Sequence, residues 1–229
     1  MTEAEWLACT DPALMLEFLQ GKVSDRKARL FAGACCRQVW RMLANQECRN
    51  LVEVSEQFAD ELASLSELEQ AREVVEESFR NAQYTWCLGV EGGSDSFLAA
   101  ARAAETGGHR EAANYARHLA EALNSPLNSP RQRAAAEEAS AFQCHLIRDI
   151  FGDPFRPVVV EQAWLSPNEG TVRRIAQAIY DERRFSDLPI LADALEEAGC
   201  TDQDVLAHCR GPGPHVRGCW VVDLILGKS

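Results

Sequence analysis

The sequence predicts an all-α protein, built as a multi-helix bundle followed by a smaller helical C-terminal subdomain. Along most of the chain, apolar residues recur at intervals of three and four, the periodicity of a helix with one buried face. Capping residues stand before several of these stretches, and glycines follow them. Segments typical of strands are nearly absent: residues 158–160 are three valines, but no nearby segment resembles a partner strand.

The N-terminal residues predict two short helices. Thr2 and Glu5 have the spacing of a capping box, in which each residue satisfies an N–H group of the other. Asp11 is suited to cap a second helix with Pro12 at its first position, and Gly21 stands just past its end.

Three longer amphipathic helices are predicted next. Ser24 is expected to start one over residues 25–43, and a second is expected over 46–62. Ser66 is expected to cap the third. Their predicted buried stripes are Phe31, Cys35, Val39 and Met42; then Leu51, Val54, Phe58 and Leu62; then Leu68, Ala71, Val75 and Phe79.

The rest of the chain predicts the domain division. Two Ala-rich helices (94–105 and 110–123) and a loop at 124–130 precede a long helix over 131–151, which we expect to end at Gly152. We therefore expect a bundle over 1–152 and a small module over 153–229. Three helices are expected in the module, at 171–182, 188–198 and 202–209, and periodicity does not decide whether 219–226 is a helix or a buried strand.

Composition narrows the class of function. The formal net charge of −12 argues against broad binding to nucleic acid or to an anionic membrane, because the field of the protein repels phosphate. We find no secretory signal and no apolar run long enough to span a bilayer. Without a signal, the nine cysteines are best interpreted as reduced thiols, so we expect a cytoplasmic protein.

Charge is arranged in blocks. Residues 22–41 hold six basic residues and one acid, whereas residues 53–77 hold nine acids and one base. Neighbouring antiparallel helices could pair these charges with each other. Alternatively, the basic helix could contact a protein partner through Arg26, Arg37 and Arg41.

Cysteine and histidine cluster near the C-terminus: Cys200, His208, Cys209, His215 and Cys219 lie within twenty residues of one another. Thiolate and imidazole ligands suit tetrahedral Zn²⁺. The most natural ligand set is Cys200, Cys209, His215 and Cys219. Because adjacent helix residues diverge by about 100°, His208 and Cys209 are not expected to face the same site. The alternative is a group of buried thiols beside a histidine-containing turn.

No complete catalytic signature is present: the chain contains no phosphate-binding loop, no H-E-x-x-H and no G-x-S-x-G. A cysteine–histidine nucleophile pair stays open, because such pairs form in space rather than in sequence.

The opening MTEAEWLACTDP resembles that of an uncharacterised family of planctomycete bacterial proteins, as does the closing LPILADALEEAGC…HCRGPGPHVRGCWVVDLILGK. The resemblance implies a helical, Ala-rich middle and no assigned activity. From the residues themselves, we expect a non-enzymatic protein that acts by contact with a protein partner. The alternatives are a zinc-binding module at the C-terminus and a cysteine–histidine enzyme.

Overall fold

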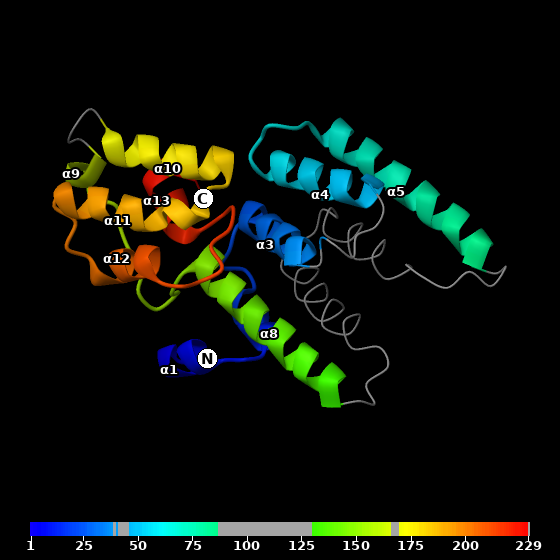
Figure 1. The fold of residues 1–229 in the computed structure, drawn as a ribbon, viewed down its shortest axis with the longest axis horizontal. Coiled ribbons are helices and arrows are strands. Elements are labelled where there is room, and N and C mark those ends of the chain that lie inside the picture. Colours follow the sequence, from blue (N-terminus) through cyan, green and yellow to red (C-terminus); the bar gives the residue numbers. More distant parts are fainter. Residues whose placement is uncertain (39, 41–45, 87–129, 166–169, 229) are drawn as a thin grey trace. The chain divides into compact units, whose positions relative to one another are not determined.

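The computed structural model describes residues 1–38, 40, 46–86, 130–165 and 170–228. Every regular element in these ranges is helical, which confirms the predicted fold class (Figure 1). The chain divides into two compact units, Met1–Cys144 and His145–Ser229. The division falls inside α8 (Pro130–Phe151), ahead of the predicted boundary at residue 152. The two predicted Ala-rich helices lie outside the described residues.

The first two helices form as their caps predict. At the start of α1 (Glu3–Ala8), the Thr2 hydroxyl accepts from the N–H of Glu5, and the Glu5 carboxylate accepts from the N–H of Thr2. At the start of α2 (Pro12–Leu19), Asp11 accepts from the N–H of Ala13 at 2.9 Å. Gly21, just past the end, has the positive φ of +73° that glycine adopts without strain.

The N-terminal unit continues with α3 (Asp25–Gln38), α4 (Gln46–Ala59) and α5 (Leu65–Trp86). Helix α4 packs against both α3 and α5 (Figure 1). Phe31 and Cys35 are fully buried, as their spacing predicts. The other two residues of that predicted stripe lie outside the described residues.

Two local predictions in this unit are wrong. Ser64, not Ser66, caps α5, because Ser64 and Glu67 form a reciprocal capping box. Leu62 follows the end of α4 and is 72% exposed, so it does not extend the buried stripe. The face of α4 that is buried carries polar as well as apolar residues, namely Cys48, Leu51, Val52, Ser55, Glu56 and Ala59.

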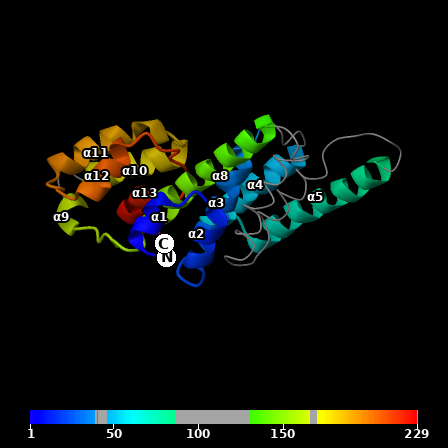
Figure 2. The same cartoon turned by 90° about the horizontal axis from the view of Figure 1, so that it is seen from below.

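The C-terminal unit contains the end of α8 followed by α9 (Gln162–Leu165), α10 (Thr171–Glu182), η2 (Phe185–Asp187), α11 (Leu188–Glu197), α12 (Gln203–Arg210) and α13 (Trp220–Leu226). Helices α10, α11 and α12 lie beside one another, and α13 packs against α10 and α12 (Figure 2). Helices α10, α11 and α12 each begin within one residue of the start predicted from the sequence. Residues 158–160 form no strand.

The structure settles the conformation of the last apolar segment. Residues Val221, Val222 and Ile225 are buried, and their spacing is that of one helical face. The buried face of α13 joins a core to which α10, α11 and α12 also contribute. This segment is therefore the helix α13, with Cys219 at the N-cap and Gly227 in the left-handed conformation after the last turn.

Candidate metal centre

The end of α8 places a carboxylate inside the C-terminal unit. Asp149 lies in the last turn of α8, and its side chain is only 3% exposed. The helix ends where Gly152 adopts a φ of +70°. A Cβ at residue 152 would lie 3.2 Å from the Trp220 ring, so the glycine also leaves room for the indole.

Helix α12 directs two neighbouring side chains to different places. Cys209 is 1% exposed and belongs to the apolar core, together with Val205 and Leu206. His208 lies about 100° around the helix, and its imidazole is half-buried and faces Asp149 and Cys219. Helix geometry predicts this divergence, but the ligand set predicted from the sequence contains Cys209 instead of His208.

The connection from α12 to α13 supplies the other two side chains. His215 follows the segment Gly211-Pro212-Gly213-Pro214, and its Nε2 faces the Gly211 carbonyl at 3.2 Å. Cys219 is fully buried at the N-cap of α13. Its N–H donates to the Val216 carbonyl at 2.9 Å, which closes a tight turn between the two residues.

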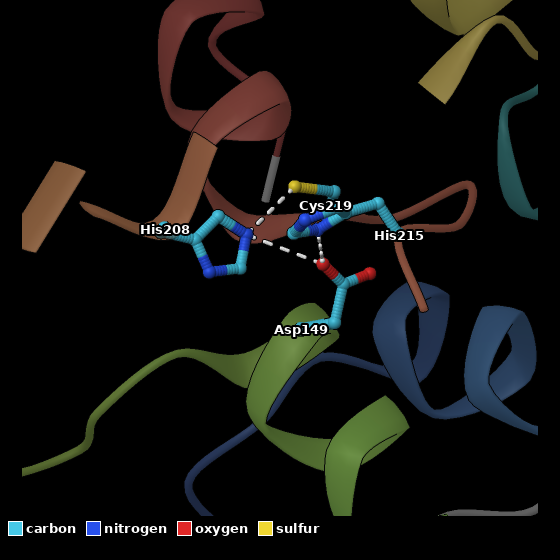
Figure 3. A group of neighbouring side chains, drawn as sticks. All are labelled: Asp149, His208, His215 and Cys219. Atoms are coloured by element: carbon cyan, nitrogen blue, oxygen red, sulfur yellow. Dashed lines mark hydrogen bonds and ion pairs between the residues drawn. The ribbon is translucent and has the colours of Figure 1, made fainter. Parts of the chain in front are cut away.

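These four side chains meet at one point (Figure 3). One ligand atom from each of Asp149, His208, His215 and Cys219 lies within 4.8 Å of all the others. Asp149 Oδ1 is 2.7 Å from His215 Nδ1 and 3.2 Å from His208 Nε2. His208 Nε2 is also 3.2 Å from Cys219 Sγ.

The hydrogen-bond partners of His215 indicate its protonation without a metal. Nδ1 faces the Asp149 carboxylate and Nε2 faces the Gly211 carbonyl, so both ring nitrogens face acceptors and each must carry a proton. Burial by itself lowers the pKa of His215, but the hydrogen bond and the charge of Asp149 raise it above its ordinary value. Burial by itself raises the pKa of Asp149, but its hydrogen bonds to His208 and His215 lower it.

The thiol of Cys219 is not activated for nucleophilic attack. Burial, followed by the nearby charge of Asp149, raises its pKa well above the ordinary range. In a cysteine–histidine–aspartate triad, the acid and the thiol bind opposite nitrogens of the imidazole. Here Asp149 and Cys219 face the same atom, His208 Nε2. This group of residues therefore lacks the geometry of such a triad, and the cysteine–histidine enzyme stays a prediction.

The structure brings together half of the sequence-predicted zinc ligands. His215 and Cys219 are in the group of four. Cys200 and Cys209 are not in it; both belong to the apolar core, and burial raises the pKa of the Cys209 thiol to about 12.

Asp149 and His208 complete the group instead, and neither belongs to the ligand set predicted from the sequence. Asp149 precedes His215 by 66 residues, so no local spacing could reveal it. One signal in the sequence favoured Cys209 over His208 as the residue that faces the core. Val205 and Leu206 precede Cys209 by four and three residues and therefore share its face of the helix.

The predicted partner-binding arginines have internal partners. Arg26 forms a 3.0 Å ion pair with Asp60, whose side chain is fully buried. Arg37 binds both carboxylate oxygens of Glu56, at 2.6 and 2.7 Å. Arg41 lies outside the described residues. Pairing between neighbouring helices, one of the two interpretations of the charge blocks, thus accounts for Arg26 and Arg37, while a protein partner stays a prediction.

Comparison with family models, curated proteins and solved structures finds no match to this chain. Among the described helices, none is both long and apolar enough to cross a membrane. The chemistry of the site is therefore interpreted from its own geometry.

Proposed function

We propose that the C-terminal unit binds one Zn²⁺ ion through Asp149, His208, His215 and Cys219, and that the ion stabilises this unit. The observation that carries the proposal is the convergence of four ligand atoms of three chemical types within 4.8 Å. The ion would join the end of α8 to α12 and to the start of α13.

Some of the separations are near those of a tetrahedral ion, whereas the longest, up to 4.8 Å, would have to shorten when the ion binds. Zinc bonds of about 2.0–2.3 Å at tetrahedral angles place neighbouring ligand atoms roughly 3.3–3.7 Å apart. His208 Nε2 lies 3.2 Å from Cys219 Sγ and 3.2 Å from Asp149 Oδ1, and both distances are close to this range. The Asp149–His215 separation of 2.7 Å is a hydrogen bond, which lengthens when the ion displaces the proton between the two atoms.

The types of ligand favour zinc over the hard cations. Mg²⁺ and Ca²⁺ prefer all-oxygen sites, whereas one thiolate and two imidazoles suit a borderline-soft ion. Cys219 is fully buried, so its thiolate is costly unless a cation compensates the charge. A bound Zn²⁺ replaces the thiol proton and removes that cost.

Hydrogen bonds around the ligands also fit metal binding. The N–H of Val216 donates to Asp149 Oδ2 at 3.0 Å and leaves Oδ1 for the ion. The Gly211 carbonyl accepts from His215 Nε2, which leaves Nδ1 as the ligand atom. Such outer contacts set the tautomer and the orientation of metal ligands in proteins.

Metal analysis of two matched variants tests the proposal. Protein purified without chelator or affinity nickel is expected to hold about one zinc per chain. Cys219→Ser and Cys209→Ser make the same chemical change at two buried thiols in one core. We expect the first variant to lose the zinc and the second to retain it.

Cobalt substitution adds a readout that does not depend on stability. The thiolate-to-cobalt charge-transfer absorption grows with the number of thiolate ligands. We expect the intensity of a single thiolate, whereas the ligand set predicted from the sequence contains three. Three outcomes would overturn the proposed ligand set. These are wild-type protein that holds no zinc after reconstitution, a cobalt spectrum typical of three thiolates, and equal loss of zinc in both variants.

A further inference from the structure

Three of the four proposed ligands are held in place by main-chain groups. Asp149 accepts the N–H of Val216, and His215 Nε2 donates to the Gly211 carbonyl. The backbone of Cys219 is fixed by its N–H, which donates to the Val216 carbonyl at 2.9 Å. Each of these ligands would keep its orientation if His208 left the ion.

His208 lacks such support. Among the residues that the structure describes, its Nε2 contacts only Asp149 and Cys219, and its Nδ1 has no hydrogen-bond partner. Its ring contacts two other rings, neither of them in parallel: the ring of His215 lies edge-on with its centroid 4.8 Å away, and that of Trp220 is tilted with its centroid 5.1 Å away. At 17% its side chain is more exposed than those of His215 and Asp149, at 10% and 3%.

The helix that carries His208 is anchored without the ion. Val205, Leu206 and Cys209 bury one face of α12 in the core. At the end of the helix, Arg210 forms ion pairs with Asp193 and Glu196 of α11. Loss of a bond between His208 and the ion would therefore leave α12 in place.

The connection that carries His215 and Cys219, unlike α12, is held by contacts with another proposed ligand. Asp149 binds it at two successive residues, through the His215 imidazole and the Val216 N–H. The turn from Val216 to Cys219 then positions the thiol. Asp149, His215 and Cys219 thus form an interlocked set, in the sense that the same stretch of chain positions all three. His208 comes from α12 and is not part of this set.

We infer that Asp149, His215 and Cys219 suffice to hold the ion, and that the position of His208 is exchangeable and accepts a small planar nitrogen base from solution. This inference rests on the proposed zinc site. The rings of His215 and Trp220 line the place of the His208 imidazole, so a flat ligand fits there. Nitrogen donors of the imidazole type suit the same borderline ions as His208 itself.

Cobalt-substituted variants test the inference, with imidazole as the probe. His208→Ala is expected to retain one cobalt per chain, with a changed visible spectrum, because water takes the vacant position. Added imidazole is expected to restore a spectrum like that of the wild type. His215→Ala, the matched control, is expected to lose stoichiometric cobalt under the same conditions, because it breaks the interlocked set.

The same titration of wild-type protein tests exchange in the intact site. Its spectrum is expected to shift at higher imidazole concentrations than that of His208→Ala, because the tethered histidine competes. Exchange of His208 for imidazole would be refuted if the wild-type spectrum stayed unchanged until cobalt was lost. It would also be refuted if His208→Ala lost cobalt as completely as His215→Ala. Failure of the wild type to bind any cobalt would instead refute the zinc site itself, so the two failures are distinguishable.

Discussion

Asp149 Oδ1 lies 2.7 Å from His215 Nδ1, and the other oxygen of the same carboxylate accepts the N–H of Val216 at 3.0 Å. A single buried side chain of α8 thereby fixes the conformation of the connection between α12 and α13. This relationship holds two ligands of the proposed zinc site in place, and it is the basis for two predictions on how the stability of the unit depends on pH and on zinc.

In metal-free protein, the stabilisation due to the Asp149–His215 pair is expected to be confined to a window of pH. The pKa of His215 lies above its ordinary 6.5, so its contribution is full below pH 6.5 and is lost as the pH rises through the raised pKa. The pKa of Asp149 lies below its ordinary 3.8, so its contribution is full above pH 3.8 and is lost as the pH falls through the lowered pKa. Denaturant unfolding in chelator, compared between wild type and His215→Gln, measures this contribution.

Zinc is expected to reverse the trend near neutral pH. Binding requires deprotonated ligands, so the stability gained from zinc rises with pH in the range where the pair in metal-free protein weakens. His215→Gln serves as the control, since it should show neither trend. A difference between wild type and variant in chelator that stays constant from about pH 5 to about pH 9 would contradict the ion pair.

Gly152→Ala is expected to destabilise the C-terminal unit more than Gly227→Ala does. Both glycines have a φ of +70°, so both substitutions carry the left-handed cost of about 1–2 kcal/mol. Only at residue 152 does the new Cβ meet another residue, the Trp220 ring at 3.2 Å; nothing lies within 4 Å at residue 227. The added overpacking is expected to cost roughly 1 kcal/mol or more, measured as a difference in unfolding free energy. Equal losses for the two variants would show that the indole adjusts freely.

Arg37→Ala is expected to destabilise the N-terminal unit by about 3 kcal/mol. The substitution leaves the carboxylate of Glu56 buried without its principal partner, and the side chain of Glu56 is only 3% exposed. Arg72→Ala is the control: it removes an exposed i,i+4 pair with Glu76 and should cost roughly 0.5 kcal/mol or less. Unfolding by urea gives both values.

A double replacement separates the cost of an unpaired charge from lost packing. Arg37→Met combined with Glu56→Met removes both charges and is expected to recover much of the stability lost in Arg37→Ala. A double variant as unstable as the single one would show that packing around Arg37, rather than its charge, carries the effect.

Much of the helical architecture could be predicted from the sequence, because its signals are local. The capping box of Thr2 and Glu5 and the termination at Gly152 depend on residues within one or two turns. The helix expected over 171–182 matches α10 at both ends, and the expected starts at 188 and 202 lie within one residue of those of α11 and α12. Where local signals compete, prediction fails: two serines stand near the start of α5, and Ser64 rather than Ser66 caps the helix.

The sequence by itself determined that this protein is helical, with metal-binding residue types concentrated near its C-terminus. Only the tertiary structure decided which of them meet. It directed Cys209 into the core and His208 out of it, and it brought Asp149 of α8 to His215 across 66 residues. It likewise paired Arg37 with Glu56. The physical reason is that helix formation depends on neighbours along the chain, whereas a ligand set depends on which faces of distant helices pack together.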